Sequence, residues 1–259
     1  MVLKSLLIGI YAGIAGIDLF NGLTHIHRPI FSGLIVGIIL GDWKTGLIAG
    51  AILELVWAGM VPLAGAQPPN VVVGGILGTA FTILANQEPT FAVGVAVPFA
   101  VAVQACITLL FTIYSPIMHK MDQYALNCET KKIDFLNYLG PVILFVFYFI
   151  ITSLPIYFGA ERAETFVSWM PDWLIDGLSV AGGIMPAVGF AMLLKIMWKR
   201  EFAPFFIIGF LLAAYLELPI IAVALIGFAI ALYDFFIGEK PAGVIAGEND
   251  VEEDYSDGI

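Results

Sequence analysis

Long runs of apolar residues follow one another along almost the whole chain, and they limit its possible folds more than any motif does. Nine such runs lie at about residues 5–22, 30–41, 46–63, 71–86, 90–114, 136–158, 173–194, 202–216 and 219–237. Hydrophobic residues make up 60% of the chain and charged residues 12%, whereas soluble domains have about 45–50% and about 25%. No soluble core could hide this much apolar surface, so lipid must cover much of it. The sequence therefore predicts an all-α membrane protein that crosses the bilayer several times.

The apolar runs differ in length, and the differences predict two kinds of helix. A straight helix needs about 20 residues to cross a hydrocarbon layer of about 30 Å. The long runs, at 90–114, 136–158 and 173–194, meet this length, but the runs at 30–41, 71–86 and 202–216 do not. Short runs interrupted by glycine and proline are typical of broken or re-entrant helices, which need protein or water around their free backbone groups. Ordinary short helices joined by loops are the alternative.

Lysine and arginine residues gather in two connecting segments, 115–134 and 195–200. Because basic loops favour the cytoplasmic side, and because two spans separate these segments, we expect both to face the cytoplasm. The first apolar run follows a single lysine and lacks a small-residue cleavage site before a polar chain. We therefore expect it to be a retained membrane helix rather than a signal peptide.

The net charge of −10 is concentrated at the C-terminal end of the chain. Residues 238–259 hold seven acidic residues and one lysine, a net charge of −6, which leaves −4 for the rest. This segment has no apolar stripe, so we expect a flexible acidic tail after a transmembrane domain at 1–237. The chain lacks the GxxxxGK[ST] motif of nucleotide-driven pumps, and neither cysteine has a set of metal ligands nearby. No cofactor, metal or nucleic acid is expected as a ligand.

The strongest functional feature is a carboxylate inside an apolar run, Glu54. A charged residue at mid-membrane costs about 2.5–3.5 kcal/mol on insertion scales, so Glu54 should face protein or water. Gly46, Gly50 and Glu54 recur every four residues, and this spacing places them on one face of a helix where the glycines allow close packing. Trp57 borders the same face. A carboxylate beside an aromatic ring suits a sugar, although a Glu at the membrane interface is the alternative.

The segment Gln67-Pro68-Pro69-Asn70 follows within 16 residues of Glu54. Consecutive prolines prevent a helix and leave neighbouring carbonyl groups free. Gln67 and Asn70 each offer two donors and one acceptor oxygen without net charge. These groups suit a neutral ligand rich in hydroxyl or amide groups better than an ion, while a plain turn is the alternative. Nearby, His25, His27 and Arg28 in the sequence THIHRP could form a basic mouth for an anionic group or mark an interface.

The residues from His27 to Asn70, HRPIFSGLIVGIILGDWKTGLIAGAILELVWAGMVPLAGAQPPN, form a recognisable region. This region resembles the signature of IIC membrane subunits of the mannose–fructose–sorbose class of the bacterial phosphotransferase system, and the signature extends over 27–75. Its Gly-Asp-x-x-x-Gly core is Gly41, Asp42 and Gly46. The stretches at 176–197 and 203–215 agree with the same class. Mannose-type subunits end the signature in Pro-Asp, whereas Pro69-Asn70 and the acidic C-terminal end resemble the N-acetylgalactosamine and galactosamine branch.

The resemblance implies a function and a set of partners. An IIC subunit pairs with a membrane IID subunit, the pairs form trimers in the bacterial inner membrane among its lipids, and an elevator-like motion carries sugar inward. A soluble IIB subunit, phosphorylated by IIA, then phosphorylates the sugar, so this chain would be a transport subunit rather than an enzyme.

The same resemblance gives roles to the residues already singled out. We expect Glu54 to accept sugar hydroxyls, Gln67 and Asn70 to bind hydroxyl or acetamido groups, and Trp57 and Pro68 to flank the sugar ring. Asp42 would fix the turn of the signature. A proton-coupled carrier that works without phosphorylation, with Glu54 as its titrating group, is the alternative function. A scaffold without a site would not need these polar residues.

Overall fold

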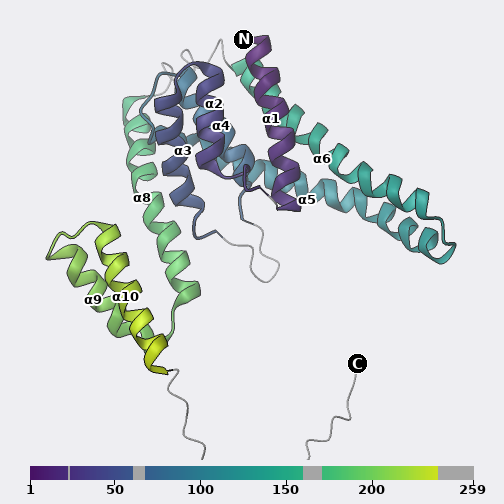
Figure 1. The fold of residues 1–259 in the computed structure, drawn as a ribbon. Helices are drawn as coiled ribbons and strands as arrows, with labels where there is room; N and C mark the ends of the chain where they lie inside the picture. The colour runs from purple at the N-terminus through teal and green to yellow at the C-terminus, as the bar shows by residue number, and fades with distance from the viewer. Residues whose placement is uncertain (23, 61–67, 160–170, 239–259) are drawn as a thin grey trace, which may run out of the picture. The chain divides into compact units, whose positions relative to one another are not determined.

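The structure is a computed structural model, and the residues that it describes, 1–22, 24–60, 68–159 and 171–238, are helical with short connections and contain no strand. The elements are α1 (Val2–Asn21), α2 (Pro29–Leu40), α3 (Trp43–Trp57), α4 (Val71–Leu84), α5 (Phe91–Leu126), α6 (Thr130–Gly159), α8 (Asp172–Met197), the 3₁₀ helix η1 (Arg200–Phe202), α9 (Ala203–Ala214) and α10 (Ile220–Gly238) (Figure 1). The predicted all-α class is confirmed.

Four helices are long and apolar enough to cross a membrane: α1, α5, α6 and the Val180–Met197 part of α8. Large apolar side chains on these helices point outward. Leu109 on α5 is 60% exposed and Val142 on α6 is 56% exposed, and lipid would cover such side chains. The prediction of a multi-pass membrane protein is confirmed, and the first apolar run forms one of the four candidate spans.

The helices α2, α3 and α4 are too short to cross a bilayer. They have 12, 15 and 14 residues, which correspond to about 18, 23 and 21 Å at 1.5 Å per residue. Ten of the 14 residues of α4 are buried. A helix that is apolar on all sides belongs inside a protein, and α4 packs against α1, α2, α3, α5 and α6. The short apolar runs predicted at 30–41 and 71–86 therefore form short helices, and α4 is buried among its neighbours.

Glycines bring α2 and α3 into backbone contact. A Cβ atom on Gly33 would lie 2.6 Å from the Cα of Gly50, and one on Gly46 would lie 2.7 Å from the Cα of Gly37. Only glycine fits at both positions, because backbone atoms cannot move aside as a flexible side chain can. The glycine face that the sequence predicts on α3 is therefore a helix-packing face, and it matches the spacing of Gly33 and Gly37 on α2.

The turn between these two helices contains the Gly-Asp pair. Gly41 has a φ of 104°, a left-handed conformation that ends α2. Asp42 begins α3 as its N-cap, and its Oδ1 accepts a hydrogen bond from the N–H of Thr45 at 3.1 Å. Hydrogen bonds from the side chain and then the backbone of Thr45 hold the pKa of the Asp42 carboxyl below its ordinary value. These residues shape the turn.

The segment 115–134, which the apolar pattern marks as a loop between two spans, is mostly helical. The helix α5 continues to Leu126, past Pro116, and α6 begins at Thr130, so only residues 127–129 connect them. The loop prediction was wrong because the end of an apolar run marks where lipid contact ends, whereas Lys, Met and Gln are good helix formers in water as well.

The chain divides into two compact units, the first covering Met1–Met197 and the second beginning at Trp198. Within the second unit, α9 packs against α10, and neither helix has a buried residue among those described. The predicted acidic tail covers 238–259, and its residues from 239 onward lie outside the part of the chain that the structure describes.

Candidate functional site

A cavity of about 440 Å³ lies in the first unit, where α3 ends and α4 begins. Its lining comes from the end of α1, from the residues before α2, from the end of α3, from the start of α4 and from one position on α5: Leu19, Phe20, His27, Arg28, Trp57, Ala58, Met60, Pro68, Pro69, Asn70, Val71 and Gln104. The volume is typical of small-molecule sites, which span about 300–1,000 Å³. Three short helices therefore place their ends around one hollow.

The position of Asn70 gives the depth of this cavity in the membrane. Its backbone N–H donates to the carbonyl of Ala100 on α5 at 3.0 Å, and its Nδ2 donates to the hydroxyl of Tyr148 on α6 at 2.7 Å. At 1.5 Å per residue, Ala100 lies about 14 Å along α5 from Phe91, and Tyr148 lies about 17 Å along α6 from Gly159. Both distances are near half of a hydrocarbon layer of about 30 Å. A hydrocarbon layer that begins at Phe91 and Gly159 would therefore have this cavity near its middle.

Asn70 is itself part of the lining, and the residue as a whole is only 2% exposed. Its Oδ1 accepts from the N–H of Val73 at 3.0 Å and so caps α4. An Asn amide has two N–H donors, and its oxygen has two lone pairs. With one donor on Tyr148 and one lone pair on Val73, the amide retains one donor and one lone pair for a ligand.

Trp57 and Pro68, also predicted as site residues, line the same cavity. The indole of Trp57 is buried, at 3% exposure, and its Nε1–H donates to the carbonyl of Pro69 at 2.9 Å. This bond uses the carbonyl acceptor that a proline segment leaves free, and it holds the Pro68–Asn70 segment against the end of α3. Gln67, the remaining member of the predicted segment, lies outside the described residues.

Glu54 lies beside the cavity rather than among the lining residues. Its Oε1 accepts from Nε of Arg28 at 2.6 Å and forms an ion pair with Nη2 of the same guanidinium group. Its Oε2 accepts from the N–H of Ile30 at 3.3 Å, in the first turn of α2, where a negative charge is favourable. Two bonds on Oε1 and one on Oε2 leave one acceptor position on Oε2. Arg28 itself lines the cavity.

Asp18 and His27 form a second pair, which is buried and which the sequence did not connect. The Oδ2 of Asp18 lies 2.6 Å from Nδ1 of His27 and accepts from the N–H of His27 at 3.2 Å. The Oδ1 of Asp18 accepts from the N–H of Thr24 at 3.0 Å and from its hydroxyl at 2.7 Å. The sequence offered two hints, an acid inside an apolar run and a histidine beside it, but not their contact. His27 lines the cavity.

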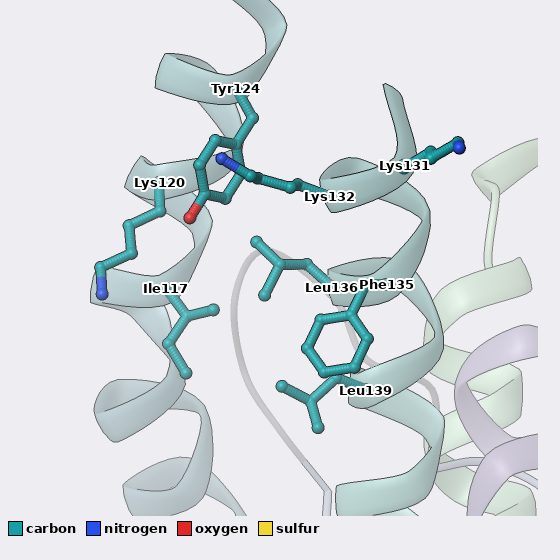
Figure 2. A pocket seen from close by; sticks show the side chains of 8 residues that line it. All are labelled: Ile117, Lys120, Tyr124, Lys131, Lys132, Phe135, Leu136 and Leu139. Atoms are coloured by element: carbon teal, nitrogen blue, oxygen red, sulfur yellow. The ribbon is translucent and has the colours of Figure 1, made fainter. Parts of the chain in front are cut away.

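A second cavity, of about 340 Å³, lies between the connected ends of α5 and α6. Figure 2 shows Lys132 reaching toward the ring of Tyr124 while Lys131 points away. The Nζ of Lys132 lies 5.0 Å from the ring centroid and 2.6 Å from Oε2 of Glu129. None of the predicted site residues lines this cavity, and it is far along both helices from Asn70. It is a poor candidate for a site at mid-membrane.

The first cavity has the chemistry of a site for a neutral polar molecule. The guanidinium group of Arg28 is paired with Glu54, and the carboxylate of Asp18 accepts hydrogen bonds from His27 and Thr24. Donors and acceptors on His27, Arg28 and Asn70 face the same hollow as the apolar surfaces of Trp57 and the prolines. No cluster of three or more potential metal ligands occurs in the part of the chain that the structure describes. A lining that combines polar groups with flat apolar surfaces suits a sugar.

Comparisons with known proteins find relatives that match this chain over most of its length. The family described as PTS system sorbose-specific IIC component matches residues 2–233. The N-acetylgalactosamine permease IIC component 1 of Escherichia coli K12 is 35% identical over 263 residues, which cover 100% of this chain and 98% of that protein. A solved structure described only as a membrane protein has 28% identity and a TM-score of 0.79. A cryo-EM structure of the mannose transporter ManYZ in complex with microcin E492 has 28% identity and a TM-score of 0.55. Each of the two covers 93% of this chain and 97% of the solved chain.

Proposed function

We propose, since the chain belongs to the family of sorbose-specific IIC components of the phosphotransferase system, that it carries an amino sugar of the N-acetylgalactosamine or galactosamine type across the inner membrane. As a member of this family it is a sugar-specific membrane transport subunit that works within a phosphotransferase complex. The specific sugar, and the phosphorylation of that sugar by a IIB subunit as it reaches the cytoplasm, are the parts that we propose.

The observation that carries the proposal is the cavity at mid-membrane, bounded by the ends of short helices. Membrane transporters place substrate sites near the midplane, at breaks in their helices, because the free backbone groups and helix ends there can bind polar ligands. The bonds from Asn70 to Ala100 and Tyr148 hold one wall of this cavity about 14 Å along α5 from Phe91 and about 17 Å along α6 from Gly159.

Two observations support an amino sugar as the substrate. The relative with an N-acetylgalactosamine name is similar over the full length of the chain, and the cavity holds Asn70 with one free amide donor and one free lone pair. An acetamido group has one N–H and one carbonyl, so it can exchange two complementary hydrogen bonds with such an amide. The positive charge of Arg28 at the cavity is balanced by Glu54, so it does not favour an anionic sugar.

We propose the same site residues that the sequence singles out. Trp57 and Pro68 flank the sugar ring, Asn70 binds the acetamido group, Glu54 accepts one hydroxyl at its remaining position on Oε2, and Gln67 contributes a further amide. Arg28 joins them as a donor toward the cavity, since its guanidinium group has more N–H groups than Glu54 occupies.

The partners follow from the family. The chain pairs with a IID membrane subunit, and the pairs assemble as trimers. The mannose transporter among the structural neighbours, with 97% of the matched chain covered, supports such a pairing. The bound sugar moves inward by an elevator-like motion, and soluble IIA and IIB subunits supply the phosphoryl group.

The experiment that tests the site is sugar uptake by cells or vesicles that contain this chain with its IID, IIB and IIA partners. Glu54→Gln and Trp57→Phe should each raise the sugar concentration for half-maximal uptake several-fold. Glu88→Gln is the matched control, because Glu88 is exposed between α4 and α5 and does not line the cavity. Uptake that is unchanged in affinity and rate by both site variants would contradict the proposed site.

A further inference from the structure

His27 is a buried polar side chain at the cavity whose neighbours occupy only part of its ring. Its side chain is 10% exposed, and it lines the cavity near Arg28 and Gln104. Its Nδ1 is taken up by Oδ2 of Asp18 at 2.6 Å. Among the described residues, no protein group is a hydrogen-bond partner of Nε2. Polar side chains that are this buried usually have a partner for each polar atom, and His27 lines the cavity, so a ligand atom in the cavity is a candidate partner for Nε2.

The contacts of Asp18 determine that Nδ1 of this ring carries a proton. Its carboxylate accepts from the backbone N–H and the hydroxyl of Thr24 and from the backbone N–H of His27, in addition to Nδ1 of His27. These four contacts fill the four acceptor positions of a carboxylate. Asp18 therefore has no position left for a ligand, and it requires a proton on Nδ1. In a neutral ring with a proton on Nδ1, Nε2 is an acceptor.

We propose that Nε2 of His27 accepts a hydrogen bond from a hydroxyl of the bound sugar and that Asp18 is the positioning residue that fixes the orientation of the ring. This inference rests on the proposed function, because it names a further contact in the same cavity. The cavity then offers complementary groups, since Arg28 donates to sugar oxygens and His27 accepts from a sugar hydroxyl. The charge of Arg28 is paired with Glu54, and a neutral His27 ring adds none, which suits a neutral or weakly basic sugar.

Two substitutions separate a ligand contact from a structural role. In His27→Asn, the amide nitrogen lies near the position of Nδ1, so the variant keeps the bond to Asp18 and loses the atom that faces the sugar. In His27→Gln, the amide lies near the position of Nε2, so the variant keeps a polar atom toward the cavity and loses the bond to Asp18. A ligand contact predicts weaker binding in His27→Asn than in His27→Gln. A structural role predicts the reverse order.

The experiment is calorimetric titration of the purified complex of this chain with its IID partner, with N-acetylgalactosamine as the first probe and galactosamine, mannose and fructose as the others. We expect His27→Asn to raise the Kd about tenfold, as loss of one buried hydrogen bond does, and His27→Gln to raise it less. His119→Asn is the matched control, because His119 is exposed on α5 and does not line the cavity. Thermal unfolding without sugar shows whether each variant is folded.

The outcomes distinguish this inference from the proposed function. Wild-type affinity in His27→Asn, equal losses in both variants, or weaker binding in His27→Gln would overturn the inference while the proposed function stands. A wild-type complex that binds none of the four sugars would overturn the proposed function, and the inference with it. If the wild type binds mannose or fructose instead of an amino sugar, the same order of Kd values for that sugar would support the contact.

Discussion

The hydrogen bond between Asn70 and Tyr148 joins residues 78 positions apart and holds the start of α4 against the middle of α6. Asn70→Ala removes this bond and the cap on the N–H of Val73. Hydrogen bonds between membrane helices contribute about 0.6–1.7 kcal/mol, and an N-cap contributes about 1 kcal/mol. We therefore expect Asn70→Ala to lower the free energy of unfolding by about 2–3 kcal/mol. Tyr148→Phe, which removes only the shared bond, should lower it by about 1 kcal/mol.

The double variant Asn70→Ala/Tyr148→Phe tests whether the two residues act through one bond. The bond can be lost only once, so the double variant should be less destabilised than the sum of the single variants, by about 0.6–1.7 kcal/mol. Unfolding by SDS in mixed detergent micelles measures these free energies. Tyr138→Phe is the matched control, because Tyr138 lies on the same helix and is 72% exposed. Additive losses, or a Tyr138→Phe effect as large as that of Tyr148→Phe, would refute the reasoning.

Three further predictions follow from the packing and the caps. Gly33→Ala should lower the unfolding free energy by about 1–3 kcal/mol, because a Cβ there meets the Cα of Gly50 at 2.6 Å. Gly183→Ala is the control and should not lower it, since nothing lies within 4 Å of a Cβ at that position. Equal melting temperatures for the two variants would contradict this. The pKa of Asp42 is lowered from 3.8. The ionised carboxylate should therefore stabilise the fold fully above pH 3.8, and this effect should disappear as the pH falls through the lowered pKa. Acid titration of thermal stability should show a steeper loss in the wild type than in Asp42→Asn. Trp57→Phe loses the hydrogen bond to the Pro69 carbonyl. This variant should keep the fold and bind sugar several-fold more weakly when binding is measured by calorimetry. Unchanged affinity would show that this bond does not shape the site.

The sequence predicts those parts of the fold that depend on the composition of single segments. Apolar runs near 20 residues long give spanning helices, and the shorter runs at 30–41 and 71–86 give short helices, because the length of a run limits how far its helix can extend in lipid. The glycine spacing on α3 likewise predicts a close helix contact. The continuation of α5 to Leu126 could not be predicted from hydropathy, because that measure reports contact with lipid and a helix also forms in water.

The candidate site is predictable where its residues are close in the sequence. Trp57, Pro68 and Asn70 lie within 14 residues of one another, and a single break between α3 and α4 brings them to one cavity. Contacts between distant residues were not predictable. Arg28 meets Glu54 across 26 positions, and Asp18 meets His27 only because the chain folds back after α1. The partner of each carboxylate depends on tertiary packing, which no local pattern encodes.

The most direct test of the proposed function is the accumulation of radiolabelled N-acetylgalactosamine by vesicles that contain this chain, alone or with its IID, IIB and IIA partners and a phosphoryl donor. Chromatography of the vesicle contents then shows whether the sugar carries phosphate. We predict sugar phosphate inside the vesicles only when all the partners and the donor are present, with galactosamine competing better than mannose. Free sugar accumulated by this chain alone, and abolished by a protonophore, would contradict the phosphotransferase mechanism and identify a proton-coupled carrier.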